Sequence, residues 1–187
     1  PQDKGAGLNF TQSTSGVGDL KLLLSRQLLQ GTQAAVSLHS QVKLPTGDPE
    51  KLTGSGGGSL SLWGVGKKSL IPGSGVTMSG YLGYLYLQNG DVLAEQVKTS
   101  NIFGGGALGW RYSGQLFFLA QLDFHTGFYR HTGYDFLGNA VLLTLGGGIH
   151  FRPDVQLKIA VAEDIKVNAS PDVSFHFSLE YRPSLSP

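Results

Sequence analysis

Cysteine is absent from this sequence, charged residues are scarce and long apolar runs are missing. A chain without cysteine forms no disulfide, no thiolate metal site and no cysteine nucleophile. No segment approaches the ~18 consecutive apolar residues of a transmembrane helix. The net charge is +1 and no basic block occurs, so we expect no nucleic-acid partner.

Composition nevertheless argues against a disordered chain. Charged residues make up 14% of the sequence, against about 25% in typical domains. Aromatic residues reach 10%, whereas disordered chains are charge-rich and aromatic-poor. Glycine is in excess, with 28 of 187 residues, about twice its usual share. The length fits a single domain, 1–187, that buries or embeds its surface without long apolar segments.

Apolar and polar residues alternate along most of the chain, most clearly over 172–182. Alternate side chains of a strand point to opposite faces. One face of this segment carries Val173, Phe175, Phe177, Leu179 and Tyr181. The other carries Asp172, Ser174, His176, Ser178, Glu180 and Arg182. The pattern predicts a strand with one apolar face, turned toward lipid, and one polar face.

Further strands are expected at 6–12, 19–29, 33–44, 58–66, 75–87, 101–112, 115–125, 139–152 and 155–165. Most exceed the usual length of about five or six residues in soluble sheets. They reach the ~9–11 residues that a tilted strand needs to cross the hydrocarbon layer. Short links such as 153–154 alternate with long ones such as 126–137, and 67–74 is a middling link in a short position.

These features predict an all-β fold, a transmembrane antiparallel up-and-down β-barrel of about ten strands. Alternation alone does not decide which face points inward, so a soluble antiparallel barrel or sandwich is the alternative. Strand length, alternating link length and the small residues of the polar face favour the membrane.

Seven short runs, in order and spacing, carry a resemblance. They are Gly18–Lys21, Val42–Asp48, Leu108–Arg111, Gln121–Thr126, Gly146–Ile149, Ala162–Ile165 and Ser170–His176. Together they resemble the domain-of-unknown-function 3187 family of bacterial outer-membrane proteins, over most of the chain from residue 16 onward. The resemblance implies an outer-membrane location and no assigned reaction. It also implies that family members extend further at the N-terminus, so that this chain is a C-terminal portion of a barrel with more strands.

The last strand is similar to the C-terminal signal that the barrel-assembly machinery reads, an alternating apolar segment that ends in an aromatic residue. Phe175, Phe177, Leu179 and Tyr181 fit this signal, whereas the tail 182–187 departs from its usual terminal aromatic. The resemblance implies this machinery as a partner.

Charged and histidine side chains on the polar faces are the candidate lumen-lining residues. They are Lys21, Lys43, Arg111, Asp123, His125, His150, Arg152, Lys158, Asp164, Asp172, His176, Glu180 and Arg182. Both signs of charge are present. The structural interpretation is a network of ion pairs that fills a narrow interior. The functional interpretation is a polar conduit for small solutes.

His176 and Ser178 form a His-x-Ser pair on one face of the last strand. The pair resembles the one that small-barrel lipid A deacylases use, and Glu180 lies on the same face as a candidate acid. Such a serine needs an adjacent base to activate it. The alternation turns the pair into the interior, whereas a deacylase meets its lipid from outside. We therefore expect no enzymatic activity, with a lipid hydrolase as the alternative.

The sequence offers no metal or cofactor site. A metal needs about three or four converging ligands, and the five histidines show no such spacing. The glycine-rich run 54–58 lacks the Gly-Lys-Ser/Thr ending of a phosphate loop, so we interpret it as a flexible external loop.

Three hypotheses follow. The first is a bacterial outer-membrane barrel in contact with membrane lipid and lipopolysaccharide, acting as a narrow porin-like channel or a structural envelope component. The second is a lipid hydrolase, and the third is a soluble ligand-binding barrel. The sequence leaves the solute, the pore diameter and the oligomeric state open.

Overall fold

The computed structural model describes residues 15–51, 53–88, 97–129, 138–166 and 173–182. Nine strands account for most of them. Their bounds are β1 Leu20–Gln30, β2 Ala34–Leu44, β3 Ser59–Ser69, β4 Val76–Leu87, β5 Ser100–Arg111, β6 Leu116–His125, β7 Ala140–Arg152, β8 Val155–Lys166 and β9 Val173–Tyr181. The described residues contain no helix able to span a bilayer.

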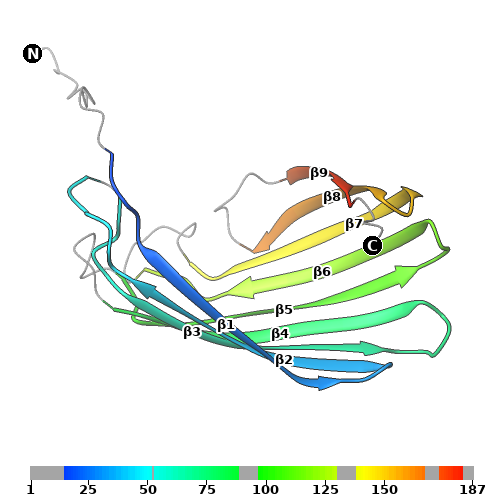
Figure 1. Cartoon of the computed structure of the whole chain (residues 1–187), viewed down its shortest axis with the longest axis horizontal. Helices are drawn as coiled ribbons and strands as arrows, with labels where there is room; N and C mark the ends of the chain where they lie inside the picture. The colour runs from blue at the N-terminus through cyan, green and yellow to red at the C-terminus, as the bar shows by residue number, and fades with distance from the viewer. Residues whose placement is uncertain (1–14, 52, 89–96, 130–137, 167–172, 183–187) are drawn as a thin grey trace, which may run out of the picture.

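All nine strands form one antiparallel sheet in chain order, from β1 to β9. Figure 1 shows this sheet curved across its strands, with β1 and β9 as its two edges. Within the described residues each edge strand pairs on one side only, so the sheet is open. The predicted all-β, antiparallel, up-and-down arrangement is confirmed. The strand expected at 6–12 lies outside the described residues.

The register explains why these sequences form these strands, because it places the apolar positions of neighbouring strands in common rows. Leu22 pairs with Val42, Val42 with Leu60, and Leu60 with Tyr86. At the opposite edge, Ile159 pairs with Phe177. Since the side-chain period of a strand is two, a slip by one residue would move a whole apolar set to the polar face. We call the apolar side the outer face and the polar side the inner face.

A β-bulge in β1 preserves this segregation. Gln27 pairs with Ser37, but the next register pair is Leu29 with Val36, so Leu28 is the extra residue. A bulge inserts one unpaired residue and shifts the phase of the strand after it. Leu29, and not Leu28 as the alternation predicts, therefore takes the outer-face position opposite Val36.

The two ends of the sheet differ in their connections. The links 31–33, 70–75, 112–115 and 153–154 are at one end, and the described parts of the links 45–58, 88–99 and 126–139 are at the other (Figure 1). We call these the short-link end and the long-link end.

The link after β3 is shorter than the sequence predicts. Residues 67–69 continue the strand, and Lys67 pairs with Ser79 and Lys68 with Met78. The turn that follows contains Gly73 and Gly75, whose φ angles are 80° and 74°. Positive φ strains other residues, so these two glycines allow the tight reversal that lets β3 run on to Ser69.

The distribution of exposed and buried side chains in this sheet is the reverse of that in a water-soluble protein. Large apolar outer-face side chains are exposed, as shown by Leu24 at 72% and Phe177 at 71%. The buried residues of the described chain include Asn101 and Ser61, both on the inner face, at 2% and 8% exposure. In soluble proteins large apolar side chains are mostly buried and asparagine and serine mostly exposed. This chain encloses its polar face and presents its apolar face.

Candidate functional site

The inner face carries pairs of oppositely charged and hydrogen-bonding side chains from neighbouring strands. On β8 and β9, Lys158 forms an ion pair with Glu180, which also accepts a hydrogen bond of 2.9 Å from Arg182. Lys158 and Glu180 are only partly exposed, at 39% and 28%. The glutamate thus lies between two cations and takes part in a small charge network at the β9 edge.

A second inner-face network joins β4 and β6 across β5. The hydroxyl of Tyr81 donates to Asp123 at 2.6 Å, and the amide of Gln121 donates to the same carboxylate at 2.8 and 3.0 Å. Gly105 lies on the strand between them. A Cβ at this position would approach Asp123 Oδ1 to 2.6 Å and Tyr81 Cε1 to 2.8 Å. The glycine therefore leaves room for a hydrogen bond that spans three strands.

Aromatic rings cover the inner face beside this network. His39 stacks on Trp63 with ring centroids 5.2 Å apart, and Phe103 lies 6.3 Å from both Trp63 and Tyr81. Between the rings Gly83 has no room for a side chain, since a Cβ would approach Phe103 Cζ to 2.4 Å and Trp63 Cβ to 2.6 Å. These contacts fill the inner face with side chains.

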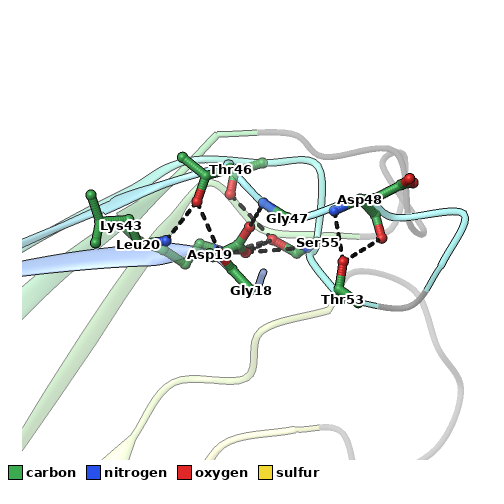
Figure 2. A network of polar contacts seen from close by, with 10 residues as sticks. Gly18, Asp19, Leu20, Lys43, Thr46, Gly47, Asp48, Thr53 and Ser55 are labelled. Carbon is green, nitrogen blue, oxygen red and sulfur yellow. Dashed lines mark hydrogen bonds and ion pairs between the residues drawn. The ribbon is translucent and has the colours of Figure 1, made fainter. Parts of the chain in front are cut away.

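A third network lies at the long-link end and ties β1 to the β2–β3 link (Figure 2). The carboxylate of Asp19 accepts hydrogen bonds from the backbone N–H of Gly47 at 3.1 Å and of Ser55 at 3.2 Å. It also accepts one from the Ser55 hydroxyl at 3.2 Å and forms an ion pair with Lys43 at 3.2 Å. The side chain of Asp19 is 10% exposed. We call Asp19, Lys43, Gly47 and Ser55 the Asp19 network.

Threonines extend the same arrangement on both sides. Thr46 Oγ1 accepts from Leu20 N–H and donates to the Gly18 carbonyl, at 2.9 and 3.0 Å. Thr53 Oγ1 accepts from Asp48 N–H at 2.9 Å, and Thr53 N–H donates to the Asp48 carbonyl at 3.0 Å. Figure 2 shows the Thr46 bonds beside the Asp19 network and the Asp48–Thr53 bonds as a separate group further along the link. The link 45–58 is thus held against the start of β1 and against itself.

Two glycines make the fold of this link possible. A Cβ on Gly47 would lie 2.5 Å from the Thr53 carbonyl oxygen and 2.6 Å from Gly54 Cα. A Cβ on Gly54 would lie 2.6 Å from Gly47 Cα and 2.7 Å from Asp19 Oδ1. These neighbours are mostly backbone and cannot move independently. Only glycine at both positions lets the two arms of the link approach closely enough to surround the Asp19 carboxylate.

Hydrogen bonds lower the pKa of both carboxyl groups in this region. The Gly47 and Ser55 N–H groups, with smaller contributions from Lys43 and the Ser55 hydroxyl, lower the pKa of Asp19 to about 2 against an opposing effect of burial. The hydrogen bond from Lys51 lowers the pKa of Asp48. Because hydrogen bonds to the charged form favour it, both groups are carboxylates at neutral pH.

The structure places most of the predicted lumen-lining residues on the inner face of the sheet. The strand register assigns to that face Lys21, Lys43, Arg111, Asp123, His125, His150, Lys158, Asp164, His176 and Glu180. Arg182 follows β9 and contacts Glu180. Arg152 follows a register shift, pairs with Val155 and forms an ion pair with Asp154 in the short turn at 3.3 Å. Asp172 lies outside the described residues.

The predicted lipid-facing residues of β9 are all exposed on the outer face. Their exposed fractions are 45% for Val173, 67% for Phe175, 71% for Phe177, 71% for Leu179 and 65% for Tyr181. Each one is opposite a β8 residue of the same face, for example Phe175 opposite Val161.

The residues of the hydrolase hypothesis share one face of β9 but have other partners. His176 Nε2 lies 3.1 Å from Ser174 Oγ, and Ser178 is opposite Lys158 in the register. Glu180 is engaged by Lys158 and Arg182. Among the described residues there is no group of three or more histidine, aspartate or glutamate side chains that could hold a metal ion.

The Asp19 network was not predicted from the sequence. Asp19 was expected on the polar face of a strand, and 54–58 as a flexible loop. The signal available was the spacing of small and polar residues in Thr46-Gly47-Asp48 and Gly54-Ser55, which is typical of hydrogen-bonded turns. Which carboxylate these turns surround is decided by the pairing of β1 with β2.

Residues 1–183 match a family described as "Protein of unknown function (DUF3187)". The chain belongs to this family. The family predicted from the seven short runs is confirmed, and two of those runs, Gly18–Lys21 and Val42–Asp48, are the ones that the Asp19 network joins. No curated protein matches the chain.

Proposed function

We propose that this member of the DUF3187 family is a bacterial outer-membrane β-barrel protein with a narrow, largely filled polar interior. The observation that carries the proposal is the exposure of apolar side chains on the outer face of all nine strands, which Arg26, Lys68 and Glu163 interrupt. Apolar outer-face side chains are exposed on every strand, including Leu22, Leu38, Leu62, Leu82 and Leu108. Monomeric soluble proteins rarely expose apolar patches larger than a few hundred Å².

The enclosed face distinguishes this proposal from a soluble barrel. A soluble barrel would bury its apolar side chains and expose its charged ones. Here Asn101 and Ser61 are buried, and the Tyr81–Asp123 hydrogen bond lies on the less exposed side of the sheet. Lipid is the solvent that suits an exposed apolar face of this size, because strands β2 to β8 pair on both sides and a closed barrel would satisfy the edges of β1 and β9 as well.

Strand length and aromatic position support the same conclusion. The strands are 9 to 13 residues long, and about 9–11 residues cross the hydrocarbon layer. At the short-link end, the Trp110 ring lies 5.3 Å from Tyr112 and 5.9 Å from Phe118. At the long-link end, Tyr84 and Tyr86 are exposed on the outer face. Aromatic girdles at both boundaries are typical of membrane barrels.

Closure of the barrel requires further strands, and strand direction restricts their number. Because the sheet is antiparallel throughout, β1 and β9 run in the same direction, from the long-link end to the short-link end. Joining them directly would make a parallel pair. An antiparallel barrel therefore needs an odd number of additional strands, which gives the even total that single-chain bacterial barrels have. The strand that the sequence predicts at 6–12 would supply one.

The filled inner face favours a structural component or a very narrow channel over a wide pore. Tyr81, Asp123, Trp63 and Phe103 make contacts across the strands that occupy the inner face. Small barrels fill their interior with side chains in this way. In planar bilayers we expect small single-channel conductance or none.

Site-directed labelling tests the membrane proposal, and the absence of native cysteine makes every introduced thiol unique. Leu82→Cys places a thiol on the outer face, and Ser79→Cys places one on the inner face of the same strand. In intact outer membranes we expect Leu82→Cys to react with a lipid-soluble maleimide but not with a water-soluble one. Ready reaction of Leu82→Cys with the water-soluble reagent, or purification of the folded protein without detergent, would refute the proposal.

A further inference from the structure

Three of the long links are hydrogen-bonded to one another at the mouth of the inner face. Gln88 N–H donates to the Gly58 carbonyl at 2.9 Å and joins the β4–β5 link to the β2–β3 link. Lys98 N–H donates to the Phe128 carbonyl at 2.7 Å, and Val97 forms a β-bridge with Tyr129. These bonds join the β4–β5 link to the β6–β7 link. The described residues of the three links thus form a hydrogen-bonded rim.

A cavity of about 370 Å³ lies within this rim. Its lining includes Lys43, Ser55, Leu85, Gln88, Val97 and Phe128. The apolar wall comes from β4 and the two later links, and the polar groups come from β2, the β2–β3 link and Gln88. Small-molecule sites are typically cavities of ~300–1,000 Å³ with apolar walls and a few polar groups that fix orientation.

The cation in this wall is already neutralised. Lys43 forms an ion pair with Asp19 and a hydrogen bond with the Ser55 hydroxyl. Asp19 in turn accepts the backbone N–H groups of Gly47 and Ser55. An anionic ligand would have to compete with Asp19 for Lys43 and would place a second negative charge beside that carboxylate. Leaving a charge unpaired in a partly buried site is costly.

We propose that this cavity binds a small neutral molecule with an apolar body and one hydroxyl or carbonyl group. The body contacts Leu85, Val97 and Phe128, and the polar group bonds to the side-chain amide of Gln88. The binding site itself is independent of the membrane proposal. Only its orientation toward the exterior rests on the proposed function, because long links of outer-membrane barrels face outward.

The two tryptophans of the chain provide a matched pair of reporters. Trp63 is on the inner face, two residues along β3 from Ser61, which pairs with Leu85 of the cavity wall. Trp110 is exposed at the opposite end of the sheet, on the outer face. Trp110→Phe leaves only the reporter near the cavity, and Trp63→Phe leaves only the reporter remote from it.

The experiment is a fluorescence titration of the full chain, folded in detergent, with a brominated medium-chain primary alkanol. Bromine quenches a nearby indole ring. We expect saturable quenching of the Trp110→Phe protein and linear, partition-driven quenching of the Trp63→Phe protein. The brominated carboxylate of equal chain length should give no saturable phase at neutral pH. A preference for the carboxylate would overturn the assignment of a neutral ligand.

Filling the cavity provides the control for specific binding. Val97→Phe, made in the Trp110→Phe background, should raise the alkanol concentration at half-saturation by about tenfold or more. A change of one methylene in an apolar pocket already alters affinity by about that much. Heat-modifiable gel migration verifies that the variant is folded, and Val97→Leu serves as a second, milder variant. Linear quenching of Trp63, or saturation unaltered by Val97→Phe, would overturn the proposal. Folding without detergent would refute the membrane proposal while leaving this titration valid.

Discussion

The outer and inner faces of the sheet carry opposite kinds of side chain and hold them in different ways. Outer-face residues such as Phe177 and Leu82 are exposed and lie beside apolar side chains of the neighbouring strands. Inner-face residues such as Tyr81 and Asp123 are held by directed hydrogen bonds. The outer face therefore determines the environment in which the protein is stable. The hydrogen bonds of the inner face determine which strands are linked to one another.

The largest expected effect comes from placing a charge on each face at adjacent positions of β6. Leu122→Arg puts a cation on the outer face, which in a bilayer costs about 2–4 kcal/mol near the midplane. Gln121→Arg puts the same cation beside its present partner Asp123, 2.8 Å from the glutamine amide. In lipid vesicles we expect Leu122→Arg to unfold at a lower urea concentration than the wild type.

The second variant of this pair should remain close to wild type. Equal destabilisation by Leu122→Arg and Gln121→Arg would contradict the distinction between the faces. The readout is the midpoint of the urea transition, followed by heat-modifiable gel migration.

A smaller effect is expected from removing one hydroxyl on each face of β4. Tyr81→Phe deletes the donor to the Asp123 carboxylate, a hydrogen bond of a class worth about 1.5–3 kcal/mol. Tyr84→Phe deletes an outer-face hydroxyl that lies 2.6 Å from Ser100 Oγ, a neutral pair of a class worth about 0.5–1.5 kcal/mol. The free energies of unfolding in vesicles should fall in that order, and a larger loss for Tyr84→Phe would show that the inner-face network contributes little.

Glycine substitutions compare the long-link end with the middle of the outer face. Gly47→Ala forces a Cβ against the Thr53 carbonyl oxygen and Gly54 Cα, and overpacking of this kind costs about 1–3 kcal/mol. Gly66→Ala adds a Cβ where no atom lies within 4 Å, so it should be neutral. Limited trypsin digestion after Lys51 measures the opening of the link. Cleavage should accelerate in Gly47→Ala alone, and an unchanged rate would contradict the close approach.

The smallest effect is a dependence on pH at the Asp19 network. The folded pKa of Asp19, about 2, lies below its ordinary value of 3.8. A depressed pKa gives a stabilising contribution that is complete above the ordinary value and is lost as pH falls through the folded one. Protection of the link from an acid protease should therefore decline between about pH 4 and pH 2 in the wild type.

Asp19→Asn is the control for this titration. The amide cannot ionise, so its protection should be lower at neutral pH and lack the acid-dependent decline. A wild-type profile that is flat over this range, or an identical decline in Asp19→Asn, would assign the acid sensitivity to other carboxyl groups such as Asp48, whose pKa is also lowered.

Alternation along the chain predicted the strands well because each strand separates two environments. The segments 115–125 and 155–165 differ from β6 and β8 by one residue at an end. The exceptions have local causes. The bulge at Leu28 depends on how β1 fits β2, and the extension of β3 to Ser69 depends on the glycine turn that follows it. Neither the bulge in β1 nor the extension of β3 can be recognised from the alternation of apolar and polar residues in that strand.

The candidate sites were less predictable than the strands. Lys43, Asp123 and Glu180 were expected on the polar face, but their partners were not, because Tyr81 and Asp123 are 42 residues apart and Asp19 and Ser55 are 36 apart. Such contacts follow from strand register. The rim cavity depends on three separate links, each of which has an ordinary loop composition.

By itself, the sequence determined the secondary structure, the two faces and the family, because a period of two residues and short local motifs are written in neighbouring positions. Only the tertiary structure decided which polar groups meet, where the long links close around a cavity, and that β1 and β9 share a direction. These properties depend on the number, order and register of all the strands, and hydrogen bonding between strands fixes them only when the whole sheet has formed.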